Sequence, residues 1–284
     1  MTQLLPPAIA SSAPERDSID ALLEAERSRQ GGVWRLLRRG FLGIALVAIA
    51  LASLREVEVS PTELWEGLPR LLSWSGRLWP PDFSEVPTFL GAIWETMAIS
   101  IVGTLTAAIA AVPLSVLVAR NLSPIPWLGG IVRSGLNLLR SIDTAIFALF
   151  FVSVVGLGPF AGAMGVALHT TGTMAKLYAE AFEALPAEPI EAIAATGCDR
   201  WRVFTFAVWP EALPSLGGIG LYLWEYNVRS SVVLGIVGAG GIGYELMVSL
   251  KLLDFARLAT ILLLILLMVS AIDAFSARIR RSLA

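Results

Sequence analysis

The chain has 284 residues, of which 56% are hydrophobic and only 15% are charged, and its mean hydropathy is +0.72. Soluble domains carry about 25% charged residues, so this composition excludes an ordinary soluble protein and favours a polytopic membrane protein. A net charge of −2 leaves no strong basic field, so we expect no nucleic-acid partner. The single cysteine, Cys198, and single histidine, His169, exclude disulfide frameworks within the chain and metal sites built from clusters of either residue.

Charge-free apolar stretches predict six transmembrane helices, because a helix needs about 20 mostly apolar residues to cross a bilayer. One stretch, Thr144–Ala175, is too long for a single span, and Gly156-Leu157-Gly158-Pro159 near its middle predicts a turn between two spans. The expected spans are Gly40–Leu54, Thr96–Ala119, one starting near Asn137, one ending near Tyr178, Pro214–Val237, and Leu258–Ile272 continuing toward Ala277.

Basic residues predict the orientation of these spans. Of the 21 Lys and Arg residues, 15 fall on the side of the N-terminus if six spans are counted. Because basic residues collect on the cytoplasmic side, we expect both termini in the cytoplasm. The fold class is therefore an all-α integral membrane protein with six transmembrane helices.

The chain divides into three expected parts. Residues 1–39 form a cytoplasmic extension, residues 40–90 hold the first span and an outer loop, and residues 91–284 form a five-helix core with a cytoplasmic loop over residues 186–210. The extension has no long apolar core near Met1, so a cleaved signal peptide is not expected. Its segment Asp17–Gln30 suits a short amphipathic helix, either on the membrane surface or solvated and frayed.

The inner loop between the fourth and fifth spans is the most informative segment. Its sequence LPAEPIEAIAATGCDRWRVFTFAVWPEALP places Ile190 and Ile193 on one face of a short helix, which Gly197 ends. Asp199 is placed to cap a second short helix starting at Arg200. Two short helices meeting at a glycine predict a cytoplasmic projection that can dock into a groove of a partner; the bland alternative is an ordinary loop.

The same loop resembles the EAA loop of ABC-importer permeases. The resemblance rests on Glu191, Ala192, Gly197 and Pro210, while Ile193 departs from the pattern at its third alanine, as do positions 207 and 209 near Pro210. In that family the loop receives the movement of the ATPase subunit. The resemblance implies an ATPase-coupling role for a set that also includes the capping residues: Glu191, Ala192, Gly197, Asp199, Arg200 and Pro210.

Longer segments are similar to the permease subunit of phosphonate importers. They are ETMAISIVGTLTAAIAAVPLSVLVARNL, FFVSVVGLGPFAGAMGVALHTTGTMAKLYAEAF and NVRSSVVLGIVGAGGIG. The resemblance implies a type I ABC importer permease fold in the bacterial inner membrane and transport of phosphonate, phosphite or another reduced-phosphorus oxyanion. It also implies a homodimer, two ATP-binding cassette subunits that bind ATP and Mg²⁺, and an outer substrate-binding protein, with no catalysis and no cofactor in this chain.

The fifth span contains two charges, Glu225 and Arg229, four residues apart on one helical face. Intramembrane charges are costly and often functional. One interpretation is a self-neutralising structural pair. The other is a translocation pathway in which an arginine offers an oxyanion two parallel N–H donors. The pathway set is Glu225, Asn227, Arg229, Ser230 and Ser231.

A glycine motif follows in the same region. Gly238, Gly240, Gly241 and Gly243 fit the pattern G-x-G-x-x-G of dinucleotide-binding folds, but the chain shows no alternation of strands and helices. We therefore expect these glycines to permit close helix packing, a kink or a break, with a hinge or gate as the functional hypothesis.

Two other classes of protein remain as alternatives. An ion-coupled secondary anion transporter would show inverted repeats and more intramembrane acids, and a membrane enzyme would need a catalytic cluster. His169 is expected to be a packing residue rather than a proton carrier. Neither lysine, Lys176 or Lys251, fits a phosphate-binding loop of the type G-x-x-x-x-G-K-[ST], so the energy must come from a partner or an ion gradient.

Overall fold

The computed structural model describes residues 37–57 and 61–283, and the regular secondary structure in these ranges is entirely helical. The chain forms two compact units, one ending at Arg70 and the other beginning at Leu71. In the first unit, the helix Leu37–Glu56 agrees with the first expected span. The amphipathic segment expected at Asp17–Gln30 lies outside the described residues.

The expected outer loop between the first two spans contains a helix that was not predicted. α2 runs from Pro61 to Arg77 and has Pro69 inside it. Glu63 in its first turn and Arg77 in its last turn both suit the helix dipole. The segment is rich in tryptophan and proline and was therefore predicted to be a loop, despite these charges at the helix ends.

The second expected span begins ten residues earlier than predicted. α3 extends from Val86 to Val118, so the charge of Glu95, which was taken to precede the membrane segment, lies within the helix. Its carboxylate has a structural role there, because it accepts a hydrogen bond from the backbone N–H of Gly241 at 2.9 Å.

The glycine-proline turn divides the long apolar stretch as expected. α5 (Thr144–Val155) ends before the turn and α6 (Pro159–Glu183) begins within it. Gly156 and Gly158 adopt φ values of 100° and 143°, a region that glycine enters without the steric cost of a Cβ atom.

The third expected span, from near Asn137 onward, is not one continuous helix, which corrects the prediction. The residues before α5 form a separate helix, α4 (Pro126–Ser141), bent by 88° from α5. Asp143 causes the break, because its carboxylate caps α5 by accepting a hydrogen bond from the N–H of Ala145 at 2.8 Å.

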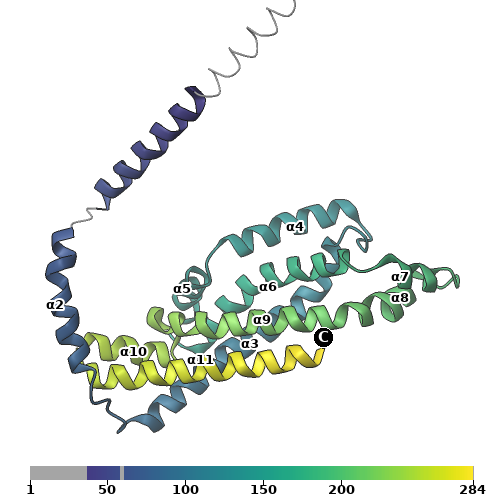
Figure 1. The fold of residues 1–284 in the computed structure, drawn as a ribbon. Coiled ribbons are helices and arrows are strands. Elements are labelled where there is room, and N and C mark those ends of the chain that lie inside the picture. The colour runs from purple at the N-terminus through teal and green to yellow at the C-terminus, as the bar shows by residue number, and fades with distance from the viewer. Residues whose placement is uncertain (1–36, 58–60, 284) are drawn as a thin grey trace, which may run out of the picture. The chain divides into compact units, whose positions relative to one another are not determined.

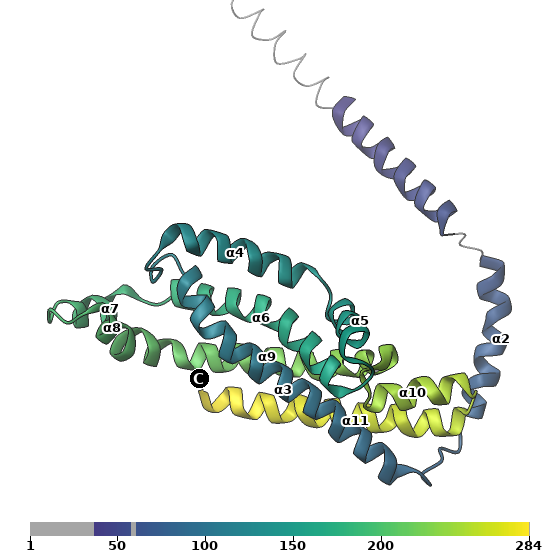
Figure 2. The same ribbon diagram turned by 180° about the vertical axis from the view of Figure 1, so that it is seen from behind.

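Helix α6 lies at the centre of the second unit and packs against α3, α4, α5 and α9 (Figures 1 and 2). Of its 25 residues, 14 are buried. Small residues permit this close packing: a Cβ atom at Gly165 would lie 2.8 Å from the backbone nitrogen of Ala148, and one at Gly172 would lie 2.9 Å from that of Arg140.

The inner loop continues directly into the fifth expected span. α7 (Ala187–Ala194) and α8 (Arg200–Val203) are followed by a π-helical segment, η1 (Phe204–Val208), and by α9 (Trp209–Leu234).

The C-terminal part contains one helix that was not predicted. After a second π-helical segment, η2 (Gly235–Ala239), the chain bends by 59° into α10 (Ile242–Lys251). The last helix, α11 (Phe255–Leu283), contains the sixth expected span and continues beyond it.

Within the described ranges, three helices are long and apolar enough to cross a membrane: Leu37–Glu56, α3 and α11. The number rises to five if two bent pairs each form one span, α4 with α5 and the segment 200–239 with α10. Large apolar side chains such as Ile109 (77% exposed), Val154 (67%) and Leu266 (64%) cover the outside of these helices. Such a surface needs lipid or another protein to cover it.

Candidate functional site

The inner loop forms the predicted projection of two short helices joined at a glycine. Gly197, between α7 and α8, adopts φ +77°. The predicted cap is confirmed, because the Asp199 carboxylate accepts a hydrogen bond from the N–H of Arg202 at 3.1 Å. In Figures 1 and 2 the two helices extend beyond the body of the second unit.

Aromatic rings fix the base of this projection. The ring centre of Phe204, in η1, lies 6.2 Å from that of Phe182 on α6, 5.9 Å from that of Trp201 on α8 and 6.1 Å from that of Trp209 at the start of α9. Phe182 is fully buried in the core. The projection is therefore packed against both α6 and α9 at its base, while its tip is free.

The residues predicted to couple to an ATPase all lie on the exposed surface of this region. They are Glu191, Ala192, Gly197, Asp199, Arg200 and Pro210. None of the residues of α7 or α8 is buried. The surface is thus open to a partner, and the coupling role itself stays a prediction.

The two charges of the fifth span pair with each other and with α11. The Arg229 guanidinium lies 2.8 Å from the Glu225 carboxylate and 2.9 Å from that of Asp273. Arg280 adds a second cation, 3.1 Å from Glu225. The charges of two arginines and two carboxylates cancel in this network. Its members on α11, Asp273 and Arg280, could not be predicted from the spacing of Glu225 and Arg229 on α9.

The remaining predicted pathway residues divide between two faces of α9. Asn227 is fully buried, donates to the Thr104 hydroxyl on α3 at 2.8 Å and accepts from the Thr170 hydroxyl on α6 at 3.2 Å. Ser231 is also buried and donates to the backbone carbonyl of Asn227, whereas Ser230 is half-buried. The structure therefore separates Asn227 and Ser231 from the Arg229 network.

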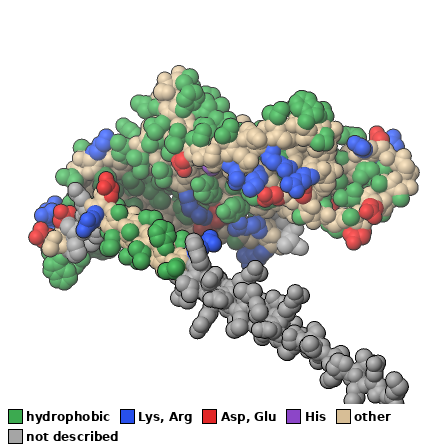
Figure 3. Space-filling model, turned by 90° about the horizontal axis from the view of Figure 1, so that it is seen from above, with side chains coloured by type: hydrophobic (Ala, Val, Ile, Leu, Met, Phe, Trp, Pro, Cys, Tyr) green, Lys and Arg blue, Asp and Glu red, His purple; other side chains and the backbone are tan. Residues whose placement is uncertain are grey.

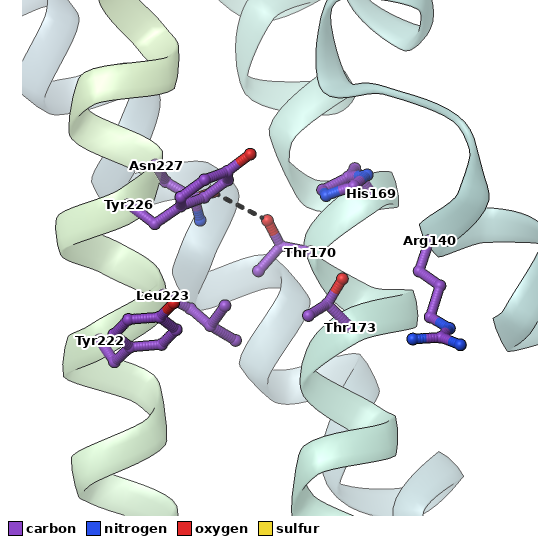
Figure 4. Close-up of a pocket in the computed structure, with 8 residues that line it drawn as sticks. All are labelled: Arg140, His169, Thr170, Thr173, Tyr222, Leu223, Tyr226 and Asn227. Carbon is purple, nitrogen blue, oxygen red and sulfur yellow. Dashed lines mark hydrogen bonds between the residues drawn. The ribbon is translucent and has the colours of Figure 1, made fainter. Parts of the chain in front are cut away.

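Asn227 borders a cavity of about 230 Å³ between α4, α6 and α9. Figure 4 shows side chains reaching it from all three helices. Its lining contains one arginine, one histidine, two threonines, two tyrosines, one leucine and one asparagine: Arg140, His169, Thr170, Thr173, Tyr222, Leu223, Tyr226 and Asn227. The lining includes no carboxylate.

Sequence reasoning missed most of this cavity. Arg140 was only counted among the basic residues on the side of the N-terminus, and Thr173, Tyr222 and Tyr226 were not singled out. Spacing held part of the signal, because Tyr222 and Tyr226 are four apart, as are His169 and Thr173. The ring of His169 packs against the break between α4 and α5, with Nδ1 2.8 Å from the carbonyl oxygen of Ile142.

A second cavity, of about 310 Å³, lies nearer the ends of α3 and α6 and shares Arg140 with the first. Two of the cations that line this second cavity are paired: Arg133 lies 3.6 Å from Glu183, and Lys176 lies 3.4 Å from Glu180. Figure 3 shows basic side chains gathered on the face that it draws, with acidic side chains beside them.

The glycine motif forms the break between η2 and α10. A break was one of the three structural roles predicted for it, beside close helix packing and a kink. Gly238, Gly240 and Gly241 adopt φ values of 99°, 83° and 72°. The start of α10 is held by α3, because the N–H of Ile242 donates to the Thr96 hydroxyl at 2.9 Å. Gly243 serves close packing, since a Cβ atom there would overlap the carbonyl oxygen of Val232.

Comparison with known proteins places this geometry in a family. Residues 111–284 match the family model described as binding-protein-dependent transport system inner membrane component. The chain is 39% identical over 250 residues to the phosphite transport system permease protein PtxC of Stutzerimonas stutzeri, covering 88% of this chain and 90% of that protein. It is 36% identical to the phosphate-import permease protein PhnE of Mycolicibacterium smegmatis, over 88% of this chain and 47% of that protein.

A solved structure supports the same fold. The chain superposes on the inward-facing MetNI methionine ABC transporter with a TM-score of 0.63 and 24% identity, covering 72% of this chain and 99% of that one. The family match extends over the projection, α9 and α11. The chain therefore belongs to the binding-protein-dependent transport system inner membrane components, the non-catalytic permease subunits of ABC transporters.

Proposed function

We propose that this permease forms the translocation pathway for phosphonate, phosphite or a related phosphorus oxyanion in an ATP-driven importer. The observation that carries the substrate class is the similarity to a phosphite permease along 88% of the chain. A permease for a phosphorus oxyanion also needs cationic and hydrogen-bonding side chains within its helices, and the cavity beside Asn227 offers both.

The proposed architecture is the type I importer fold, with six spans and both termini in the cytoplasm. Burial of α6 supports counting it as the sixth span beside the five candidates. At 1.5 Å per residue its 25 residues reach about 37 Å, enough for a hydrocarbon core of about 30 Å. Its buried polar residues Thr170 and Thr171 lower its hydropathy, but the neighbouring helices separate them from lipid.

The proposed assembly is a homodimer in the bacterial inner membrane. Two ATP-binding cassette subunits, which bind ATP and Mg²⁺, dock on its cytoplasmic side, and an outer substrate-binding protein delivers the anion. The family's dependence on a binding protein supports the last partner. Helices α7 and α8, none of whose residues is buried, supply an exposed helical surface on which the ATPase can dock.

Coupling in this proposal follows the packing of the projection. Movement of the ATPase displaces the exposed tip around Glu191 and Gly197. The aromatic contacts of Phe204 then transmit the displacement to α6 and α9, which border the cavity. A rigid-body movement of packed helices is a common means of switching between two states.

The pathway in this proposal follows the face of α9 that carries Asn227. The pairing of Arg229 with two carboxylates supports the structural alternative for Glu225 and Arg229. The glycines at the η2–α10 break are proposed as a hinge or gate. Their positive φ values and the 59° bend support a site where α10 can turn relative to α9.

Affinity purification and uptake together test the proposed function. The tagged chain, extracted from its native membrane, should co-purify with a P-loop ATPase and a second copy of itself. Proteoliposomes holding that complex and its binding protein should take up radiolabelled phosphite or methylphosphonate. Uptake should require ATP on the side of the membrane that carries the ATPase subunits. Uptake driven by a proton or sodium gradient without ATP would contradict the proposal.

A further inference from the structure

Arg140 brings an unneutralised positive charge to the cavity between α4, α6 and α9. Its Nε donates to the Asn137 amide oxygen at 3.1 Å, but no carboxylate of the described residues lies within ion-pair distance of it. Arg133 and Arg229, by contrast, each have an acidic partner. The guanidinium of Arg140 therefore retains its capacity to bind an anion through two parallel N–H groups.

Hydroxyl groups with no protein partner line the same cavity. In the part of the chain that the structure describes, no hydrogen bond joins the side chains of Thr173, Tyr222 or Tyr226 to another residue. Tyr222 and Tyr226 are 55% and 44% exposed, so the cavity is open and a ligand can enter and leave. Figure 4 shows these groups on facing sides of the cavity, the tyrosines on α9 and Thr173 on α6.

His169 is oriented so that one ring nitrogen remains for a ligand. Its Nδ1 lies 2.8 Å from the Ile142 carbonyl oxygen. A carbonyl only accepts hydrogen bonds, so Nδ1 carries the proton and Nε2 is the free nitrogen. Nε2 is therefore an acceptor for a P–OH group. Partly protonated phosphorus oxyanions, whose second pKa is near 6 in phosphate monoesters, carry such a group.

The back of the cavity is a rigid polar wall. Asn227 is held by Thr104 and Thr170, and all three side chains are buried. Their hydrogen bonds join α3, α6 and α9, so the wall fixes the spacing of the helices that carry the free groups. His169 and Thr173 lie about 15 Å and 21 Å along the 25-residue α6, which places the cavity near the helix middle.

We infer that this cavity is a transient binding site for a tetrahedral phosphorus oxyanion on its way through the permease. The inference rests on the proposed function and specifies its site. Arg140 supplies the charge, and Thr173, Tyr226 and His169 supply hydrogen bonds. The volume of about 230 Å³ admits an anion of phosphate size with several waters. A single cation and an open cavity give the weak binding that transport requires, and Arg140 also borders the second cavity.

Uptake by the complete importer gives the first test. In proteoliposomes with ATPase and binding protein, Arg140→Gln should lower uptake of phosphite and methylphosphonate about ten- to a hundredfold, the factor for losing one charge-assisted hydrogen bond. Arg140→Lys, which keeps the charge but not the planar fork, should retain more uptake than Arg140→Gln. Arg278→Gln, the same change at an exposed residue of α11, is the matched control and should transport normally.

Protection from thiol modification gives a second test that does not depend on turnover. Thr173→Cys in a Cys198→Ser background places a thiol in the cavity. Phosphite or methylphosphonate at millimolar concentration should slow its reaction with a small cationic thiosulfonate at least threefold, whereas sodium chloride of equal ionic strength should not. Adding Arg140→Gln should abolish the protection, although the thiol stays accessible.

The outcomes separate the two levels of the proposal. If the wild-type importer takes up phosphorus oxyanions, the proposed function stands. Normal uptake by Arg140→Gln, or no protection at Thr173→Cys, then overturns the cavity assignment alone. Failure of the wild-type importer to move phosphite, methylphosphonate or phosphate overturns both. An Arg140→Gln complex that assembles, hydrolyses ATP, transports poorly and loses protection supports the site.

Discussion

Arg140 and Arg229 have the same side chain but opposite electrostatic surroundings. Arg229 lies between the carboxylates of Glu225 and Asp273, and Arg140 meets no carboxylate among the described residues. The sequence drew attention to Arg229 because it falls inside an apolar span. It could not identify Asp273 as a neighbour, because that residue is 44 positions away on another helix.

The α9–α11 network predicts a difference between single and double variants. Arg229→Gln alone should lower the free energy of unfolding by about 1–3 kcal/mol, because it leaves the Asp273 carboxylate without its cation, while Arg280 still pairs with Glu225. Arg229→Gln/Asp273→Asn removes both members of one pair, leaves Glu225 paired with Arg280, and should recover both stability and near-normal uptake. Thermal denaturation of the detergent-solubilised complex and uptake assays measure the two effects.

A double variant that folds and assembles but still transports poorly would contradict this expectation. That result would place Arg229 on the anion's route, as the pathway interpretation holds. Phosphite uptake and ATP hydrolysis must therefore be measured on the same preparation, so that a transport defect is separated from a defect in assembly.

Gly243 shows how a single missing Cβ sets a helix contact. A Cβ atom there would overlap the carbonyl oxygen of Val232, so Gly243→Ala should lower stability by about 1–3 kcal/mol, the usual cost of overpacking. Gly130→Ala, at a helical position with no atom within 4 Å of the new Cβ, is the control and should be neutral or slightly stabilising. Equal melting temperatures for the two variants would contradict this expectation. They would show that α9 and α10 move apart at little cost in free energy.

At the scale of elements, local signals predicted the short helices and turns best. Asp199 capped α8, Gly197 ended the turn after α7, and the Gly156–Pro159 segment separated α5 from α6. Such features depend on residues within one or two turns of each other. Helices α2 and α10 were missed because neither has a long apolar run, and the α4–α5 bend was missed because hydropathy does not report direction.

The projection predicts separation of ATP hydrolysis from transport. Gly197→Pro should abolish most uptake, because proline fixes φ near −65° and Gly197 requires +77°. Glu191→Arg should do the same by reversing an exposed charge on α7. ATP hydrolysis by the complex should lose its stimulation by substrate-loaded binding protein, while membrane insertion, measured by protease protection, stays normal.

Asparagine provides a matched control at the same position. Gly197→Asn should keep much of the uptake, because asparagine tolerates the left-handed region better than other side chains. Normal uptake together with stimulated hydrolysis in Gly197→Pro/Glu191→Arg would show that this projection is not the coupling element.

At the scale of the whole molecule, the fold depends on a helix that hydropathy alone undervalues. α6 carries His169, Thr170 and Thr173, yet it packs against four other helices. Among the residues that the structure describes, a count of apolar spans gives three to five, and six requires α6. The number of spans therefore depends on how the helices pack together, and it decides on which side of the membrane each terminus lies.

Cysteine labelling tests the six-span orientation. In a Cys198→Ser background, Trp74→Cys should react with an impermeant thiol reagent added outside intact cells, because residue 74 follows the first span. Ser282→Cys, near the end of α11, should react only after permeabilisation. The proposed topology has an odd number of spans between residues 74 and 282. Reaction of both from the outside would require an even number and would exclude that topology.

The sequence by itself determined the membrane class, the helical fold, the projection and the family resemblance. Composition, apolar length, capping residues and glycines act over short stretches of chain, so these properties can be read without a structure. Only the tertiary structure decided which charges are neutralised and which remain free, because that depends on distance between helices. Asp273 reaches Arg229 from α11, whereas α4, α6 and α9 meet around Arg140 without a carboxylate in the cavity lining.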